Sequence, residues 1–156
     1  MRRALLLAAL VTFGGCKKNS RPPALGEAVA VEQPGGSATQ LIAQGSEIPT
    51  SATESFTTSR DDERRLAIHV LRGDGRTAAK MHSEGWWLVD GVQPGRAGEP
   101  RVHVTFEVDA QGGLSVSARQ EDRKLKVSRT DGDDGKLKPA VLAEPDDSED
   151  AEEEPD

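Results

Sequence analysis

The side chains that could perform metal or acid–base chemistry are few in this sequence and lie far apart along it. Its histidines are His69, His82 and His103, whereas a metal site needs ligands that converge at short spacing. Residues 131–135, Asp-Gly-Asp-Asp-Gly, resemble part of a calcium loop but lack the later bidentate Glu. There is no phosphate-binding glycine loop ending in Lys-Ser/Thr and no nucleophile elbow. We therefore expect no enzyme, no catalytic residue, no metal and no cofactor or nucleotide.

The single cysteine, Cys16, indicates acylation instead. Residues 1–15 contain two arginines, a short apolar run and two glycines, which is the layout of a secretory signal too short to span a bilayer. Cys16 after Phe13-Gly14-Gly15 resembles the lipobox of bacterial lipoproteins; an ordinary signal peptide is the alternative. The resemblance implies a lipid anchor at Cys16 and a tether over residues 16–24. Lys17, where an Asp would favour the inner membrane, implies the outer membrane of the bacterial cell envelope, facing the periplasm or the exterior.

The C-terminal end of the sequence is strongly acidic. Residues 144–156 contain nine Asp and Glu and no Lys or Arg, so the rest of the chain sums to −7 + 9 = +2. Such a composition cannot bury enough apolar surface to offset chain entropy. We predict a disordered acidic tail over residues 131–156. The acidic balance also argues against nucleic acid as a partner, because nucleic-acid binding needs a clustered basic face.

Between these ends the apolar residues alternate with a period of two, as in half-buried strands. Val102, Val104, Phe106 and Val108 form the clearest strand. Turn residues follow at 109–113, and the alternation resumes at 114–118, which predicts a hairpin. The other predicted strands cover residues 26–33, 39–43, 53–58, 65–71, 86–90 and 124–128. No apolar stripe at helical spacing occurs, so we predict an all-β antiparallel sandwich of about eight short strands over residues 25–130.

Several short blocks in this region resemble, in order and spacing, the peptide-binding β-domain of the DnaK-type 70-kDa heat-shock chaperone family. The blocks are Leu25-Gly-Glu-Ala-Val29, Leu41-Ile-Ala43, Ile48-Pro-Thr50, Phe56-Thr-Thr58, Asp61-Asp62, Ile68-His-Val-Leu-Arg-Gly73, Asp90-Gly-Val-Gln-Pro94, Pro100–Asp109 and Leu114–Ala118. The family's ATPase domain and helical lid have no counterpart here, so we expect the β-domain alone.

In this family two loops clasp an extended peptide, whose main chain is bonded like a strand while one side chain enters an apolar pocket. Carried over position by position, the resemblance implies a groove between residues 33–38 and 59–64. The pocket would be lined by Val31, Phe56, Leu66 and Ile68, or these side chains would simply fill the sandwich. Pro34 and Ser59 would form the arch over the peptide, with Pro34 unable to donate a backbone hydrogen bond.

Trp86 and Leu88 are candidates for a second functional surface. In the predicted strand over residues 86–90, Trp87 and Val89 face the core, which directs Trp86 and Leu88 to a face that is usually polar. An exposed apolar patch can mark a partner surface, although a loop or the tether could instead cover it.

These observations predict a membrane-anchored, ATP-independent module that binds extended or unfolded polypeptide segments. The alternative is an adaptor lipoprotein that kept the sandwich and docks a specific envelope protein through the face of Trp86 and Leu88 or through the acidic tail.

Overall fold

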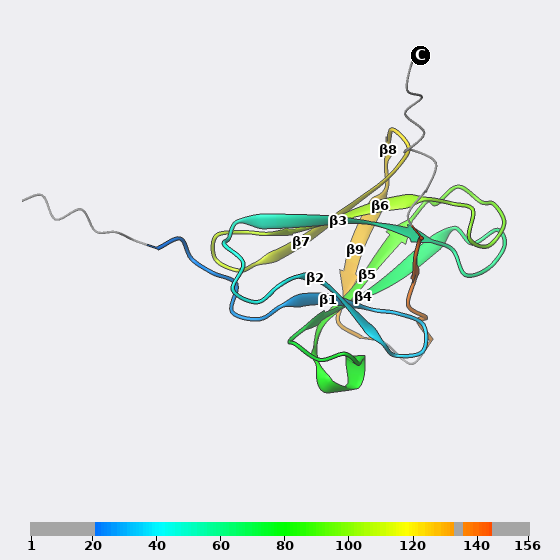
Figure 1. The fold of residues 1–156 in the computed structure, drawn as a ribbon. Helices are drawn as coiled ribbons and strands as arrows, with labels where there is room; N and C mark the ends of the chain where they lie inside the picture. Colours follow the sequence, from blue (N-terminus) through cyan, green and yellow to red (C-terminus); the bar gives the residue numbers. More distant parts are fainter. Residues whose placement is uncertain (1–20, 133–135, 145–156) are drawn as a thin grey trace, which may run out of the picture.

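The structure is a computed structural model that describes residues 21–132 and 136–144. Two five-stranded antiparallel sheets pack face to face (Figure 1). The first sheet has the order β2-β1-β4-β5-β9 and the second β10-β3-β6-β7-β8. The strands are β1 Val29–Glu32, β2 Ala38–Ile42, β3 Thr50–Thr57, β4 Arg65–Arg72, β5 His82–Asp90, β6 Val102–Val108, β7 Leu114–Gln120, β8 Arg123–Lys124, β9 Lys126–Thr130 and β10 Val141–Leu142. The predicted all-β sandwich is confirmed. A single 3-10 turn, η1 at Ala78–Lys80, precedes β5.

The alternation along β6 places its apolar side chains in the core. Val102, Val104 and Phe106 are fully buried, whereas the residues between them are partly or fully exposed. β6 pairs with β7 in the register that sets Phe106 opposite Val116. The turn between them is stabilised by Asp109, whose Oδ1 accepts hydrogen bonds of 2.8 Å from the N–H groups of Gln111 and Gly113. The predicted hairpin is therefore present.

β4 is a central strand of the first sheet, paired with β1 on one side and β5 on the other. Leu66, Ile68 and Val70 face the core, as their alternation predicts. The pairing with β1 is short, because only Val29–Val31 lie opposite Arg72–Val70. The N-terminal half of β4 is thus left without a β1 neighbour, and this gap becomes the edge of the functional site.

The predicted boundary between sandwich and tail at residue 130 is too early. Residues 136–144 lie against the sandwich, and Val141–Leu142 form a strand paired with β3. The reason is that residues 139–143, Pro-Ala-Val-Leu-Ala, are an apolar stretch that precedes the acidic run and can be buried without desolvating a charge. The predicted signal over residues 1–15, the anchor at Cys16, residues 133–135 of the calcium-loop fragment at 131–135 and the tail beyond 144 lie outside the described residues.

Candidate functional site

The C-terminal segment (Figure 1, orange) runs between β3 of the second sheet and β4 of the first, and bonds to both. We call the site that it occupies the groove. On the β4 side, the N–H of Ala140 donates to the carbonyl of Ala67 at 2.8 Å. This carbonyl belongs to the part of β4 that has no β1 neighbour. The segment thus supplies a bond that the first sheet leaves unmade.

On the opposite side, the segment adds a strand to the free edge of β3. Val141 lies opposite Thr57 and Leu142 opposite Phe56 in antiparallel register, and the N–H of Ala143 donates to the carbonyl of Ser55 at 2.8 Å. The other edge of β3 is paired with β6 along its length. One short segment therefore bonds to both sheets at once.

A third contact comes from the loop between β1 and β2. The N–H of Leu142 donates to the side-chain oxygen of Gln33 at 3.1 Å. This loop is a tight turn in which Gln33 N–H bonds the carbonyl of Ser37 and Gly36 N–H bonds that of Gln33. Gly35 and Gly36 have φ values of 93° and 82°, a backbone conformation for which glycine is suited. The turn holds the Gln33 amide over the segment.

The four predicted pocket residues lie in the core of the sandwich. Val31, Phe56, Leu66 and Ile68 are each at most 2 % exposed. They belong to a single hydrophobic cluster that also contains Ala140, which is 6 % exposed, and Leu142 packs against the same cluster. These residues are thus part of the sandwich core, and the side chain of a segment in the groove joins that core.

The loop between β3 and β4, residues 58–64, forms one wall and is fixed from behind by the loop that follows β5. Asp62 N–H donates to the carbonyl of Gly95 at 2.8 Å, and the Asp61 carboxylate accepts from Ala97 N–H at 2.8 Å. Ser59 bonds within its own loop, to Glu63. The wall is held by neighbouring loops whether or not a segment lies beside it.

Comparison with known proteins agrees with this geometry. The model of the protein family described as Hsp70 protein matches residues 25–153. The chain belongs to the Hsp70 family. The match covers the whole sandwich and the segment in its groove, so this is a chaperone-like, Hsp70-related domain.

The predicted arch residues of this Hsp70 domain, Pro34 and Ser59, are both exposed. In the β1–β2 loop the bond to the segment comes from Gln33, which the sequence reasoning missed. A long amide side chain next to a proline, which has no N–H to offer, was the available signal. Ala67 and Ser55 were missed because they act through backbone carbonyls, which carry no residue-type signal.

Two hydroxyls at the groove edge stand out among the described residues. Thr57 and Thr58 are 6 % and 2 % exposed, and neither Oγ1 has a hydrogen-bond partner within that part of the chain. A buried hydroxyl without a partner costs about 1–3 kcal/mol. The occupied groove of the Hsp70 domain therefore keeps unused hydrogen-bonding capacity next to the segment.

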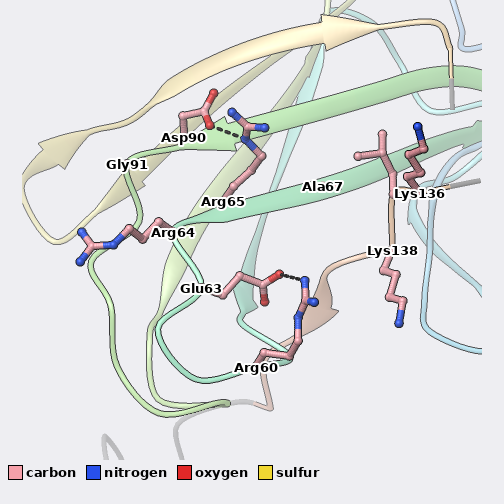
Figure 2. A pocket seen from close by; sticks show the side chains of 10 residues that line it. Arg60, Glu63, Arg64, Arg65, Ala67, Asp90, Gly91, Lys136 and Lys138 are labelled. Carbon is pink, nitrogen blue, oxygen red and sulfur yellow. Dashed lines mark hydrogen bonds and ion pairs between the residues drawn. The ribbon is translucent and has the colours of Figure 1, made fainter. Parts of the chain in front are cut away.

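A hollow of about 590 Å³ continues the groove beyond Ala67. It is lined by Arg60, Glu63, Arg64, Arg65, Ala67, Asp90, Gly91, Lys136, Leu137 and Lys138. Figure 2 shows Arg64 and Arg65 on one side and the lysines of the C-terminal segment on the other. Glu63 is already bonded to Arg60, and Asp90 to Arg65. With five cations and two acids, the lining carries a formal charge of 5 − 2 = +3.

The predicted exposed face at Trp86 and Leu88 needs correction. Trp86 is only 6 % exposed, because the ring of His69 stacks flat on it with centroids 4.3 Å apart. His69 is held in this position because it bonds Glu32 through Nδ1 and Ser83 through Nε2. Leu88 is partly exposed. Because His69 covers Trp86, this face lacks the exposed apolar patch that was one of the two docking surfaces of the adaptor alternative.

Within residues 21–132 and 136–144, no cluster of three or more His, Cys, Asp or Glu forms a metal site. The other two histidines have local partners, since His103 bonds Ser55 at 3.0 Å and His82 lies 3.9 Å from Glu27. Over the same residues, no helix is long and apolar enough to cross a bilayer.

Proposed function

We propose that this Hsp70-family domain binds extended segments of other polypeptides in the groove between β3 and β4. The observation that carries the proposal is the bonding of residues 140–143, whose N–H groups reach β4, β3 and the β1–β2 loop while Ala140 enters the hydrophobic cluster. Backbone groups give such a site affinity for any extended chain, and the pocket gives it a preference among side chains. An unfolded client exposes both features.

The groove supports weak binding with rapid exchange. The N–H groups of Ala140, Leu142 and Ala143 hold the segment by hydrogen bonds, and a hydrogen bond exchanged with water contributes about 0.5–1.5 kcal/mol net. Side-chain burial adds about 0.8 kcal/mol for each buried methylene-sized group. Association costs several kcal/mol in lost freedom of motion. We therefore expect dissociation constants in the micromolar to millimolar range for short peptides.

The proposal includes binding without ATP and anchoring at a membrane. The groups that bond Ala140, Leu142 and Ala143 lie on the sandwich itself, so this mode of binding needs no second domain. The proposal of a membrane anchor is based on Cys16 and the signal-like residues before it. An acyl group there would hold the domain at the bacterial envelope, where it would retain unfolded segments close to the membrane.

Anisotropy of a fluorescein-labelled peptide with the sequence of residues 137–144, titrated with the full chain, tests the binding. We expect saturable binding, weakened about 3- to 10-fold by Gln33→Leu because one hydrogen bond is lost. Gln40→Leu, a matched change on the exposed face of β2, should leave it unchanged. A peptide with prolines at the positions of Leu142 and Ala143 should not bind, and equal binding of that peptide would contradict strand-like recognition.

A further inference from the structure

The segment that fills the groove contains β10, and the pairing of the neighbouring strands β3 and β4 with their other partners does not depend on it. β3 is paired along its other edge with β6 from Thr50 to Phe56, and β4 is paired with β5 from Arg65 to Arg72. Both sheets therefore keep their ladders when β10 leaves. We propose that residues 139–143 are an intramolecular ligand of the peptide groove, which an outside peptide must displace. This inference rests on the function proposed above.

The segment also fits its site imperfectly, as an exchangeable ligand should. Alanine is the smallest apolar side chain and Ala140 is the one that joins the hydrophobic cluster. The hydroxyls of Thr57 and Thr58 stay buried and unpartnered within the described residues. Thr57 lies opposite Val141, so a client peptide that presents an acceptor to its hydroxyl would gain a bond that the chain's own segment does not make.

The charge of the hollow adds a second mismatch. Lys138 brings a positive charge to a lining that already contains Arg60, Arg64 and Arg65. The two acids of that lining each have an arginine partner. The chain's own segment is therefore a poorer electrostatic match than a client with a neutral or acidic residue at the same place. The ligand class that follows is an extended segment with an apolar side chain at the pocket and no cation two residues before that side chain.

Covalent connection compensates for these mismatches. Nine residues separate Thr130, the end of β9, from Ala140, and short connections raise a ligand's effective concentration to the millimolar range. A weak ligand held in this way still fills its site most of the time. An outside peptide binds only the chains whose groove is empty, so its apparent dissociation constant is the intrinsic one divided by the fraction of such chains. We expect this to weaken the apparent affinity roughly 10- to 100-fold.

Peptide anisotropy on full-length variants tests the inference. Ala140→Asp places a carboxylate in the hydrophobic cluster, which should expel the segment. We expect the labelled 137–144 peptide to bind this variant at least tenfold more tightly than the wild-type chain. Ala110→Asp, the same change at an exposed turn position, should bind as wild type does. Ala143→Pro, which removes the N–H bonded to Ser55, provides a second variant if Ala140→Asp fails to fold by near-ultraviolet circular dichroism.

The outcomes separate this inference from the proposed function. If both variants and the wild type bind the peptide equally, the groove is not occupied and the inference fails while peptide binding stands. If the variants bind no peptide although amide exchange shows their segment released, the proposed function fails. Wild-type dimers or larger species that dissociate in the Ala140→Asp variant, seen by light scattering, would show a segment supplied by a second copy and would overturn the intramolecular arrangement.

Discussion

β7 and β10 belong to the same sheet, but they are held there by different means. β7 pairs with β6 over six residue pairs and is joined to it by a turn that Asp109 stabilises. β10 pairs over two residue pairs and reaches β3 from the far end of the chain. The first arrangement is the scaffold of the sandwich, and the second is the geometry of a bound peptide. This contrast in pairing is the basis for our proposal that the edge of β3 is available for exchange.

The largest expected effect lies on the scaffold side. Phe106→Ala removes a fully buried ring that packs 6.2 Å from that of Phe56, and should lower the free energy of unfolding by about 3–5 kcal/mol. Urea denaturation followed by tryptophan fluorescence measures it. Val141→Ala in β10 should cost less than about 1 kcal/mol, because its side chain is only partly buried. Equal losses for the two variants would remove the distinction between scaffold and ligand.

Hydrogen exchange at native conditions should separate the two strands next. The amides of Val104 and Phe106 should exchange only through global unfolding, and those of Leu142 and Ala143 through a local opening of about 1–2 kcal/mol. Nuclear magnetic resonance resolves the two classes residue by residue. Protection of the β10 amides equal to that of β6 would mean that β10 is a permanent strand.

The turn of the scaffold hairpin contributes a smaller amount. Asp109→Ala deletes the acceptor of two backbone hydrogen bonds and should lower the free energy of unfolding by about 1–2 kcal/mol. Peptide affinity should not change, because the turn does not contact the groove segment. The matched control is Glu107→Ala on the exposed face of β6, and a similar loss in that control would show that the turn bonds are not responsible.

The smallest effect concerns the charge of the hollow. A peptide of residues 137–144 in which Lys138 is replaced by Glu should bind the Ala140→Asp chain about 2- to 5-fold more tightly at low salt, since exposed ion pairs contribute up to about 1 kcal/mol. The gain should vanish at high salt. The affinity of a peptide with Gln at this position should lie between those of the Lys and Glu peptides. Tighter binding of the Lys peptide would contradict the electrostatic mismatch.

The sequence predicts the fold well because the strands of a sandwich are encoded locally. The alternation of Val102, Val104 and Phe106 and the turn at Asp109 specify the hairpin without knowledge of the rest of the chain. The resemblance implies the pocket residues Val31, Phe56, Leu66 and Ile68, which lie in the hydrophobic core of the sandwich, and their role in binding a peptide stays a prediction.

The occupant of the groove was not predicted, because it depends on long-range pairing. Two paired residues carry too little periodicity to be recognised as a strand, and the acidic residues after position 143 dominate the composition of the C-terminal end. The burial of Trp86 was missed for a similar reason. Its cover is His69, a residue on the neighbouring strand, which alternation along a single strand cannot reveal.

The most direct test of the central claim is hydrogen exchange at Ala140, Leu142 and Ala143 of the wild-type chain during titration with an unlabelled client peptide. If the segment is a ligand of the groove, these amides are protected in the free chain and lose protection in proportion to bound peptide, while β6 stays protected. If the peptide saturates the chain and these amides keep their protection, the groove between β3 and β4 is not the peptide site and the account is wrong.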